Sequence, residues 1–213
     1  MSGKIEHIIK WADSAVPEWG KQYMRPAFEG DRDAAFSLMC ACHDHQRADI
    51  VTALWALRVP PETFKVALAF AMGQTHHYSD VRAAAGSRAR LVRWCRYAKF
   101  NLPSDLPEDV KIYRGVRDCS VKAALRGLSW TLEFDVAAWF ATRWKASNPL
   151  VISAIMRRPY LVYFDDAGGS EREVLPASVP SNYSILRGID AGGPLIQEAA
   201  DRYEDHITSQ FVA

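Results

Sequence analysis

Two glutamates, Glu171 and Glu173, are the side chains whose types and spacing most directly indicate chemistry. They follow a turn-forming run at residues 165–169 and precede apolar residues. If this segment enters a β-strand, the two carboxylates share one face about 7 Å apart and Arg172 points to the other. Such a pair suits a reaction at a sugar, because one carboxylate can stabilise positive charge on a ribose ring while the other receives a proton. A solvated strand face is the alternative.

A second motif, Tyr113-Arg114-Gly115, closes a predicted strand over residues 110–113. An arginine at a strand end can bind the two phosphates of a dinucleotide in fork geometry. Gly115 would let the backbone approach such a ligand closely. Tyr113 is either a ligand contact or a core residue, and Arg114 alone would be interpreted as half of a structural salt bridge.

A third motif lies in the next predicted strand, over residues 128–131. Ser129 and Thr131 fall on the same side of that strand and offer hydroxyl groups to a ribose, or to the glutamate itself. A helix is predicted at about 135–144, where Trp139 or Phe140 presents a flat face to an aromatic ligand ring. Packing within the protein is the alternative for at least one of these two side chains.

In this order and spacing, the motifs resemble the arginine, serine–threonine and Glu-x-Glu signature of the mono-ADP-ribosyltransferases, in the branch known as R-S-E. The resemblance covers roughly residues 110–189. It implies that NAD is the substrate, without a metal, and that Glu173 is the catalytic glutamate. Arg114 would be the cofactor arginine, Ser129 the site serine, and Glu171 the acid that orients or deprotonates the acceptor. The remaining NAD contacts would come from Tyr113, Gly115, Thr131, Trp139 and Phe140. Trp130 departs from the family, which usually carries a threonine there.

The chemistry of NAD cleavage fits these residue types. Nicotinamide leaves as a neutral molecule, so the demand is to stabilise an oxocarbenium-like ribose and to hold its 2′-hydroxyl, which a carboxylate can do. The sequence therefore predicts an NAD-dependent mono-ADP-ribosyltransferase, a glycosyltransferase acting on a macromolecular acceptor, with a protein side chain ahead of RNA or DNA. The alternatives are a nucleic-acid ADP-ribosyltransferase, a non-catalytic binding module on the same fold, and a plain NAD hydrolase.

The elements that must position these residues change character along the chain. Helical periodicity before about residue 100 and short strands after it predict an α+β protein. We expect a helical region at 1–105 and an NAD-binding core at 106–213, for which the resemblance implies an ADP-ribosyltransferase-like split β-sandwich. Helices are predicted near 5–11, 63–73, 80–100 and 195–207, with helical spacing also over 33–58. Further strands are predicted at 150–155, at 160–164, from the pair Glu171 and Glu173 onward, and at 183–186. The proline-rich stretch 101–109 is predicted to be the loop that links the two regions.

Four arginines fall within one arc of about 120° on the predicted helix 80–100: Arg82, Arg90, Arg93 and Arg96. They indicate a surface that binds phosphates or an acidic partner. An ordinary solvated helix face is the alternative. The segment Cys40-Ala41-Cys42-His43-Asp44-His45 looks like a metal site. Two thiols at that spacing on a helix point about 200° apart, however, so we expect no metal there. We expect none at the adjacent His76 and His77 for the same reason.

Composition sets broad limits on function. The chain has 213 residues, of which 49% are hydrophobic and 24% charged, and this excludes wholesale disorder. A formal net charge of +1 favours no particular partner. No apolar run approaches the roughly 20 residues of a membrane span, and no apolar segment typical of a signal peptide follows residues 1–7. We expect a cytoplasmic protein of a bacterial cell, such as a toxin or a phage effector in an infected host.

Overall fold

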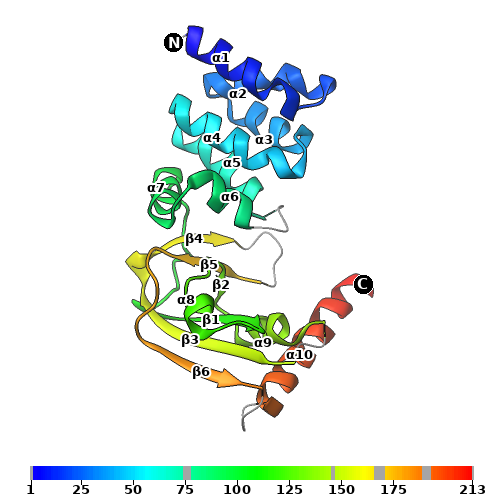
Figure 1. Cartoon of the computed structure of the whole chain (residues 1–213), viewed down its shortest axis with the longest axis vertical. Coiled ribbons are helices and arrows are strands. Elements are labelled where there is room, and N and C mark those ends of the chain that lie inside the picture. The colour runs from blue at the N-terminus through cyan, green and yellow to red at the C-terminus, as the bar shows by residue number, and fades with distance from the viewer. Residues whose placement is uncertain (1, 74–77, 145–146, 166–170, 189–192, 213) are drawn as a thin grey trace. The chain divides into compact units, whose positions relative to one another are not determined.

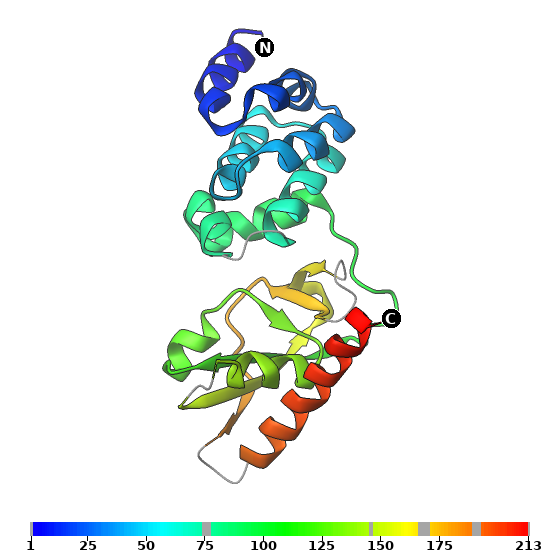
Figure 2. The same cartoon turned by 90° about the vertical axis from the view of Figure 1, so that its right-hand side faces the viewer.

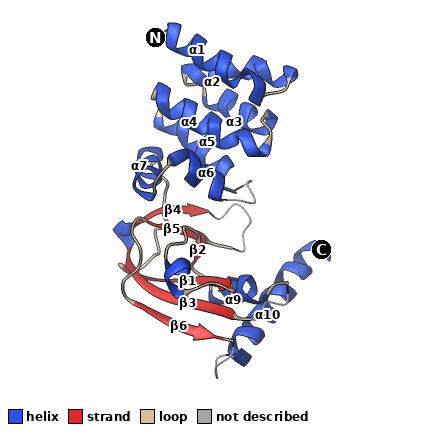
Figure 3. Ribbon diagram, in the orientation of Figure 1, coloured by secondary structure: helices blue, strands red, loops and turns tan. Residues whose placement is uncertain are grey.

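The structure, a computed structural model, describes residues 2–73, 78–144, 147–165, 171–188 and 193–212. It consists of two compact units, Met1–Phe100 and Asn101–Ala213. Helices make up the first unit and all the described strands belong to the second (Figure 3), which confirms the predicted α+β class. His76, His77 and most of the predicted turn at 165–169 lie outside the described residues. In the described part of the chain, no helix combines the length and apolar character needed to cross a bilayer.

The first unit is built around helix α5 (Pro61–Gly73), the helix predicted over 63–73. Phe64, Ala67 and Leu68 are fully buried, and α5 contacts α3, α4, α6 and α7. The Phe64 ring packs against those of Trp55, Trp94 and Tyr97, in edge and tilted geometries that aromatic pairs favour. The surrounding helices, visible in Figure 1, are α1 (Ser2–Ala12), α2 (Met24–Glu29), α3 (Arg32–Ala41), α4 (Arg47–Leu57), α6 (Tyr78–Ala85) and α7 (Arg88–Ala98).

The helix predicted over 80–100 is broken into α6 and α7, so the predicted stripe of four arginines on one helix is wrong. Gly86 adopts a left-handed backbone, with φ of +73°, and ends α6. The Ser87 hydroxyl then accepts a 3.2 Å hydrogen bond from Arg90 N and starts α7. Three of the arginines, Arg90, Arg93 and Arg96, remain together on the exposed side of α7, whereas Arg82 belongs to α6.

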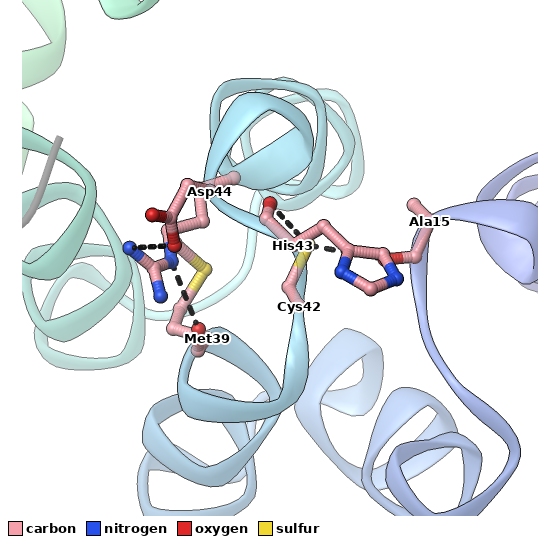
Figure 4. Close-up of polar contacts among 6 residues, drawn as sticks. Ala15, Met39, Cys42, His43 and Asp44 are labelled. Carbon is pink, nitrogen blue, oxygen red and sulfur yellow. Dashed lines mark hydrogen bonds and ion pairs between the residues drawn. The ribbon is translucent and has the colours of Figure 1, made fainter. Parts of the chain in front are cut away.

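The segment that resembled a metal site is held by other contacts (Figure 4). Helix α3 ends at Ala41, and the buried Cys42 thiol lies 3.3 Å from the Ala15 carbonyl oxygen to which it donates. Arg47 forms a 2.7 Å ion pair with Asp44 and donates from Nε to the Met39 carbonyl. Among the described residues, no group of three or more His, Cys, Asp or Glu side chains could hold a metal ion. These contacts also explain why 33–58 is two helices, since the chain turns between α3 and α4.

Burial raises the pKa of the Cys42 thiol to about 11. The unfolded chain then loses this proton at lower pH than the folded protein, so the free energy of unfolding falls as the pH rises from about 9 to about 11. Urea denaturation across that range should show the fall, and Cys42→Ala should make it shallower. Burial raises the pKa of Cys95 to about 12, so the free energy of unfolding of the variant still falls somewhat with pH. An identical pH dependence of the free energy of unfolding in both proteins would contradict the role of Cys42.

In the described part of the second unit, six strands form one antiparallel sheet in the order β4-β5-β2-β1-β3-β6 (Figure 1). Their bounds are β1 (Asp109–Arg117), β2 (Trp130–Thr131), β3 (Pro149–Arg157), β4 (Leu161–Asp165), β5 (Glu173–Pro176) and β6 (Tyr183–Arg187). The helices of this unit are α8 (Val121–Leu125), α9 (Phe134–Thr142) and α10 (Gly193–Val212).

The two faces of the sheet carry separate cores. On one face, α9 packs on β1 and β3, and α10, red in Figure 2, packs against α9; Val151 and Tyr113 point to this side. The other face has Ile112, Trp130 and Val174, covered in part by α8. Because side chains alternate along a strand, the odd-numbered residues of β1 face α9 and the even-numbered ones face α8. This alternation decides where each predicted site residue lies.

Candidate functional site

The three sequence motifs lie on three neighbouring strands, β1, β2 and β5. Tyr113 pairs with Thr131, and Thr131 pairs with Glu173. Residues directly opposite each other in an antiparallel pair have their side chains on the same face. Tyr113, Thr131 and Glu173 therefore form one row across the sheet, on the face covered by α9. Pairing of β1 with β2, and of β2 with the more distant β5, brings together two of the predicted cofactor residues and the predicted catalytic glutamate.

Arg114 lies on the other face. Strand β1 continues to Arg117, so Arg114 is inside the strand rather than at its end as predicted. Its guanidinium donates a hydrogen bond to the Ser129 carbonyl oxygen and packs directly on Gly127, where a Cβ atom would overlap it. The side chain thus secures the chain as it enters β2. The position indicates a positioning role, because the row containing Glu173 is on the opposite side of the sheet.

Arg114→Lys should lower the free energy of unfolding by about 1.5–3 kcal/mol, the usual worth of a hydrogen bond to a charged group. The planar guanidinium packs on Gly127 and also reaches the Ser129 carbonyl oxygen. A lysine has no planar group that could make both contacts at once. Guanidinium denaturation measures the change. Normal stability combined with weakened NAD binding would show instead that Arg114 is the cofactor arginine that the sequence predicts.

The serine–threonine motif is used largely for structure. Ser129 is half-buried and precedes β2, whose described pairing starts at Trp130. Trp130 is buried and donates from Nε1 to the Gly127 carbonyl oxygen at 3.2 Å. The Thr131 hydroxyl donates to the Glu171 carbonyl oxygen at 2.5 Å and accepts from Glu133 N at 3.0 Å. Thr131 therefore holds the segment that carries the glutamates through the backbone of Glu171, whereas the sequence predicts a hydroxyl for a ribose or for the glutamate.

The two glutamates do not form the predicted pair on one strand face. Strand β5 begins at Glu173, and Arg172 has a φ of +41°, so the chain is not extended from Glu171 to Glu173. Two contacts hold this turn: Leu132 N donates to the Arg172 carbonyl oxygen at 3.2 Å, and Arg172 forms a 2.8 Å ion pair with Glu133. Glu171 is exposed and Glu173 half-buried, so their environments differ.

Gly115 and the two aromatic residues of α9 are packed against protein. A Cβ at Gly115 would lie 2.6 Å from the Ala137 carbonyl carbon and 2.9 Å from Ala141 N, so the helix occupies the space predicted for a ligand. The Trp139 ring packs edge-on against Tyr203 of α10 at 5.6 Å between centroids. Phe140 lies 4.2 Å from the Arg143 guanidinium. Packing, the alternative considered for these aromatics, accounts for both positions.

A cavity of about 490 Å³ is lined by Tyr113, a member of the row, and by Arg172, the residue before Glu173. Its volume lies in the range of small-molecule sites. The Tyr113 ring packs on Phe134 at 5.5 Å, giving it an aromatic wall. Its full lining is Tyr113, Leu132, Glu133, Phe134, Asp135, Val136, Arg172, Arg202, Tyr203 and His206.

Charge around this cavity is balanced by ion pairs. Arg202 binds Asp135 through two hydrogen bonds of 2.8 and 2.9 Å, and this carboxylate raises the pKa of the Arg202 guanidinium. Arg172 donates one 2.8 Å hydrogen bond to the Glu133 carboxylate. Sequence reasoning missed this cavity because Arg202 and Tyr203 reach it only once α10 has docked on α9.

A second group of residues that sequence reasoning missed lies where α9 ends: Arg117, Arg143 and Trp144. The signal was available, since Arg143 is three residues after Phe140 and four after Trp139, the spacings that place side chains together on a helix. Burial lowers the pKa of Arg143, the charge of Arg117 lowers it further, and Glu171 acts in the opposite direction.

Comparison with protein-family models, with curated proteins and with solved structures gave no match to this chain.

Proposed function

We propose that the second unit is an NAD-dependent mono-ADP-ribosyltransferase with an ADP-ribosyltransferase-like core, and that Glu173 is its catalytic glutamate. The observation that supports this most is the row Tyr113–Thr131–Glu173, which three separate motif strands build beside a cavity of about 490 Å³. Tyr113 lines the cavity, and Glu173 follows directly on Arg172, which also lines it. Cleavage at a ribose requires a carboxylate that stabilises the positive charge developing there, and Glu173 lies on the same sheet face as Tyr113.

In this proposal the bond between the ribose C1′ and the nicotinamide nitrogen breaks, and its electron pair leaves with neutral nicotinamide. The Glu173 carboxylate stabilises the positive charge that develops on the ribose and holds its 2′-hydroxyl. The acceptor nucleophile then bonds to C1′ and releases a proton to Glu171, which is solvent-exposed and accessible to a macromolecule.

The phosphates of NAD would bind at Arg172 and Arg202, which line the cavity. Their present partners, Glu133 and Asp135, are carboxylates that a pyrophosphate would replace, because guanidinium binds both anions in the same fork geometry. Arg114 and Ser129 then act as positioning residues that hold β2 in register, rather than as ligands of the cofactor.

The test is incubation of the full chain with a bacterial lysate and NAD labelled on its adenylate phosphate. We expect label in macromolecules, with nuclease or protease treatment showing which class carries it. Release of nicotinamide without labelled macromolecules would identify a hydrolase and contradict the transfer step. Absence of nicotinamide release in lysate would contradict the enzyme proposal as a whole.

A further inference from the structure

We propose that Arg117, Arg143 and Trp144 form a binding site for single-stranded nucleic acid, in which a base stacks on Trp144 and backbone phosphates bind the two arginines. The three residues come from different places: Arg117 ends β1, and Arg143 and Trp144 follow α9. They belong to the same unit as Glu173 but are distinct from the cavity assigned to NAD.

The geometry of the cluster is compact. The Arg117 and Arg143 guanidinium carbons lie 4.0 and 4.2 Å from the centre of the Trp144 ring. Arg117 also donates a 3.0 Å hydrogen bond to the Arg143 carbonyl oxygen, which fixes the strand end to the helix end. Arg143 in addition lies over Phe140. Two cations are therefore stacked over one exposed indole, and contacts on both elements hold them there.

The charge of the cluster is not balanced by ion pairs. Over the described residues, neither Arg117 nor Arg143 forms a salt bridge, whereas Arg157, Arg172 and Arg202 of the same unit each do. Burial and, after it, the neighbouring charge of Arg117 lower the pKa of Arg143, so the second guanidinium adds to the cost of charging the first. An anion placed between them would relieve this repulsion and accept charge-assisted hydrogen bonds from both side chains.

Trp144 is exposed in a way that packing does not explain. Its side chain is 71% exposed, and its φ of +64° is one that a bulky residue rarely adopts. Strained positions of this kind persist where the surroundings hold them, and they concentrate at binding sites. The indole is kept in solvent, and the guanidiniums lie over it. A base can stack on the exposed part of the ring or on a guanidinium plane, and the same arginines can bind the neighbouring phosphates.

An aromatic ring flanked by arginines is the combination with which proteins bind unpaired bases and the phosphates between them. A duplex would hide the base faces, and an acidic peptide would make no use of the exposed ring. A free nucleotide would leave most of its surface in water here, because small ligands prefer enclosed sites. A single strand makes contacts on both sides of Trp144 and fits this open surface best.

The Glu171 carbonyl oxygen accepts from Thr131, which pairs with Tyr113 of β1. Arg117 lies on the same face of β1 as Tyr113, so a strand bound at Arg117 would pass along the face that carries the Glu-x-Glu motif. Combined with the proposed function, this site makes nucleic acid the acceptor of ADP-ribose. Only this assignment of the acceptor rests on the proposed function. The binding itself requires no transfer activity and can be measured without NAD. Failure of one proposal is therefore distinguishable from failure of the other.

The test is fluorescence anisotropy of the full chain with fluorescein-labelled oligo(dT) and oligo(U) of about 16 nucleotides, the upper size of a common single-strand site. Trp144→Ala should weaken binding about tenfold or more, and Trp144→Phe should keep part of the affinity. Arg117→Gln and Arg143→Gln should each lower the slope of log affinity against log salt by about 0.7. Trp19→Ala, at a tryptophan 61% exposed in the first unit, and Arg32→Gln are the matched controls and should bind normally.

Several results would overturn the proposal. They are binding by the wild type that does not depend on salt, unchanged affinity in Trp144→Ala, equal affinity for a labelled DNA duplex of the same length, and displacement of the strand by an equal concentration of NAD. Poly-glutamate binding as tightly as the oligonucleotides would show an acidic-protein surface instead. Circular dichroism checks the fold of each variant, and Trp144→Gly, which accepts a positive φ without strain, replaces Trp144→Ala if the alanine variant does not fold.

Discussion

Glutamine in place of Glu173 is expected to lower the rate of nicotinamide release from NAD by about 10²- to 10⁴-fold, the usual loss when a charged catalytic group is neutralised. Glutamine keeps the size and shape of the side chain, and the backbone pairing of β5 with β2 at Thr131 does not involve the carboxylate. The variant therefore removes the negative charge of the side chain at nearly constant size and leaves the strand pairing in place. Release measured at saturating NAD reports the chemical step directly.

Glu204→Gln provides the matched control, since Glu204 is an exposed glutamate on α10 of the same unit. It should release nicotinamide at the wild-type rate. Equal rates in wild type and Glu173→Gln, with both proteins folded, would show that another group carries the reaction. If neither protein released nicotinamide, the non-catalytic binding module on the same fold would be the interpretation that agrees with the result.

Element types could be predicted where the periodicity of apolar residues is strong. Helix α5 and strand β3 lie close to their predicted positions, because Phe64, Ala67 and Leu68 recur at helical spacing and residues 150–155 are rich in β-branched side chains. The break at Gly86 was also visible, as a glycine followed by a serine that caps a helix. The arginines on both sides of Gly86 have the spacing of one continuous helix, and this favoured the prediction of a single helix.

The faces of the site residues could not be predicted with the same security. A strand predicted to end at Tyr113 leaves Arg114 free to turn toward a ligand, whereas a strand that runs to Arg117 fixes its face by alternation. The extended segment expected from Glu171 to Glu173 is turned by partners distant in sequence, Thr131 and Glu133. Contacts of this kind depend on which strands become neighbours, and that is decided by the whole sheet.

Gly115→Ala is the substitution expected to damage the fold most, with a loss of about 3 kcal/mol or more in the free energy of unfolding. The added methyl group would meet the backbone of α9 at Ala137 and Ala141, and backbone atoms cannot move aside as the end of a side chain can. Helix α9 would be pushed off β1, and α10, which packs on α9, would lose its support. Denaturation in guanidinium gives the size of the loss, and hydrogen exchange should place it at β1 and α9.

Gly3→Ala is the control, since a Cβ at Gly3 in helix α1 would meet nothing within 4 Å. That change should leave stability unchanged or raise it by up to about 1 kcal/mol, because alanine favours a helix over glycine. The sequence predicts that Gly115 lets a ligand approach, and the two explanations give opposite results. A stable Gly115→Ala protein that binds NAD weakly would support the ligand role. Loss of stability in the absence of NAD would mean that the glycine is required because α9 lies directly on the strand.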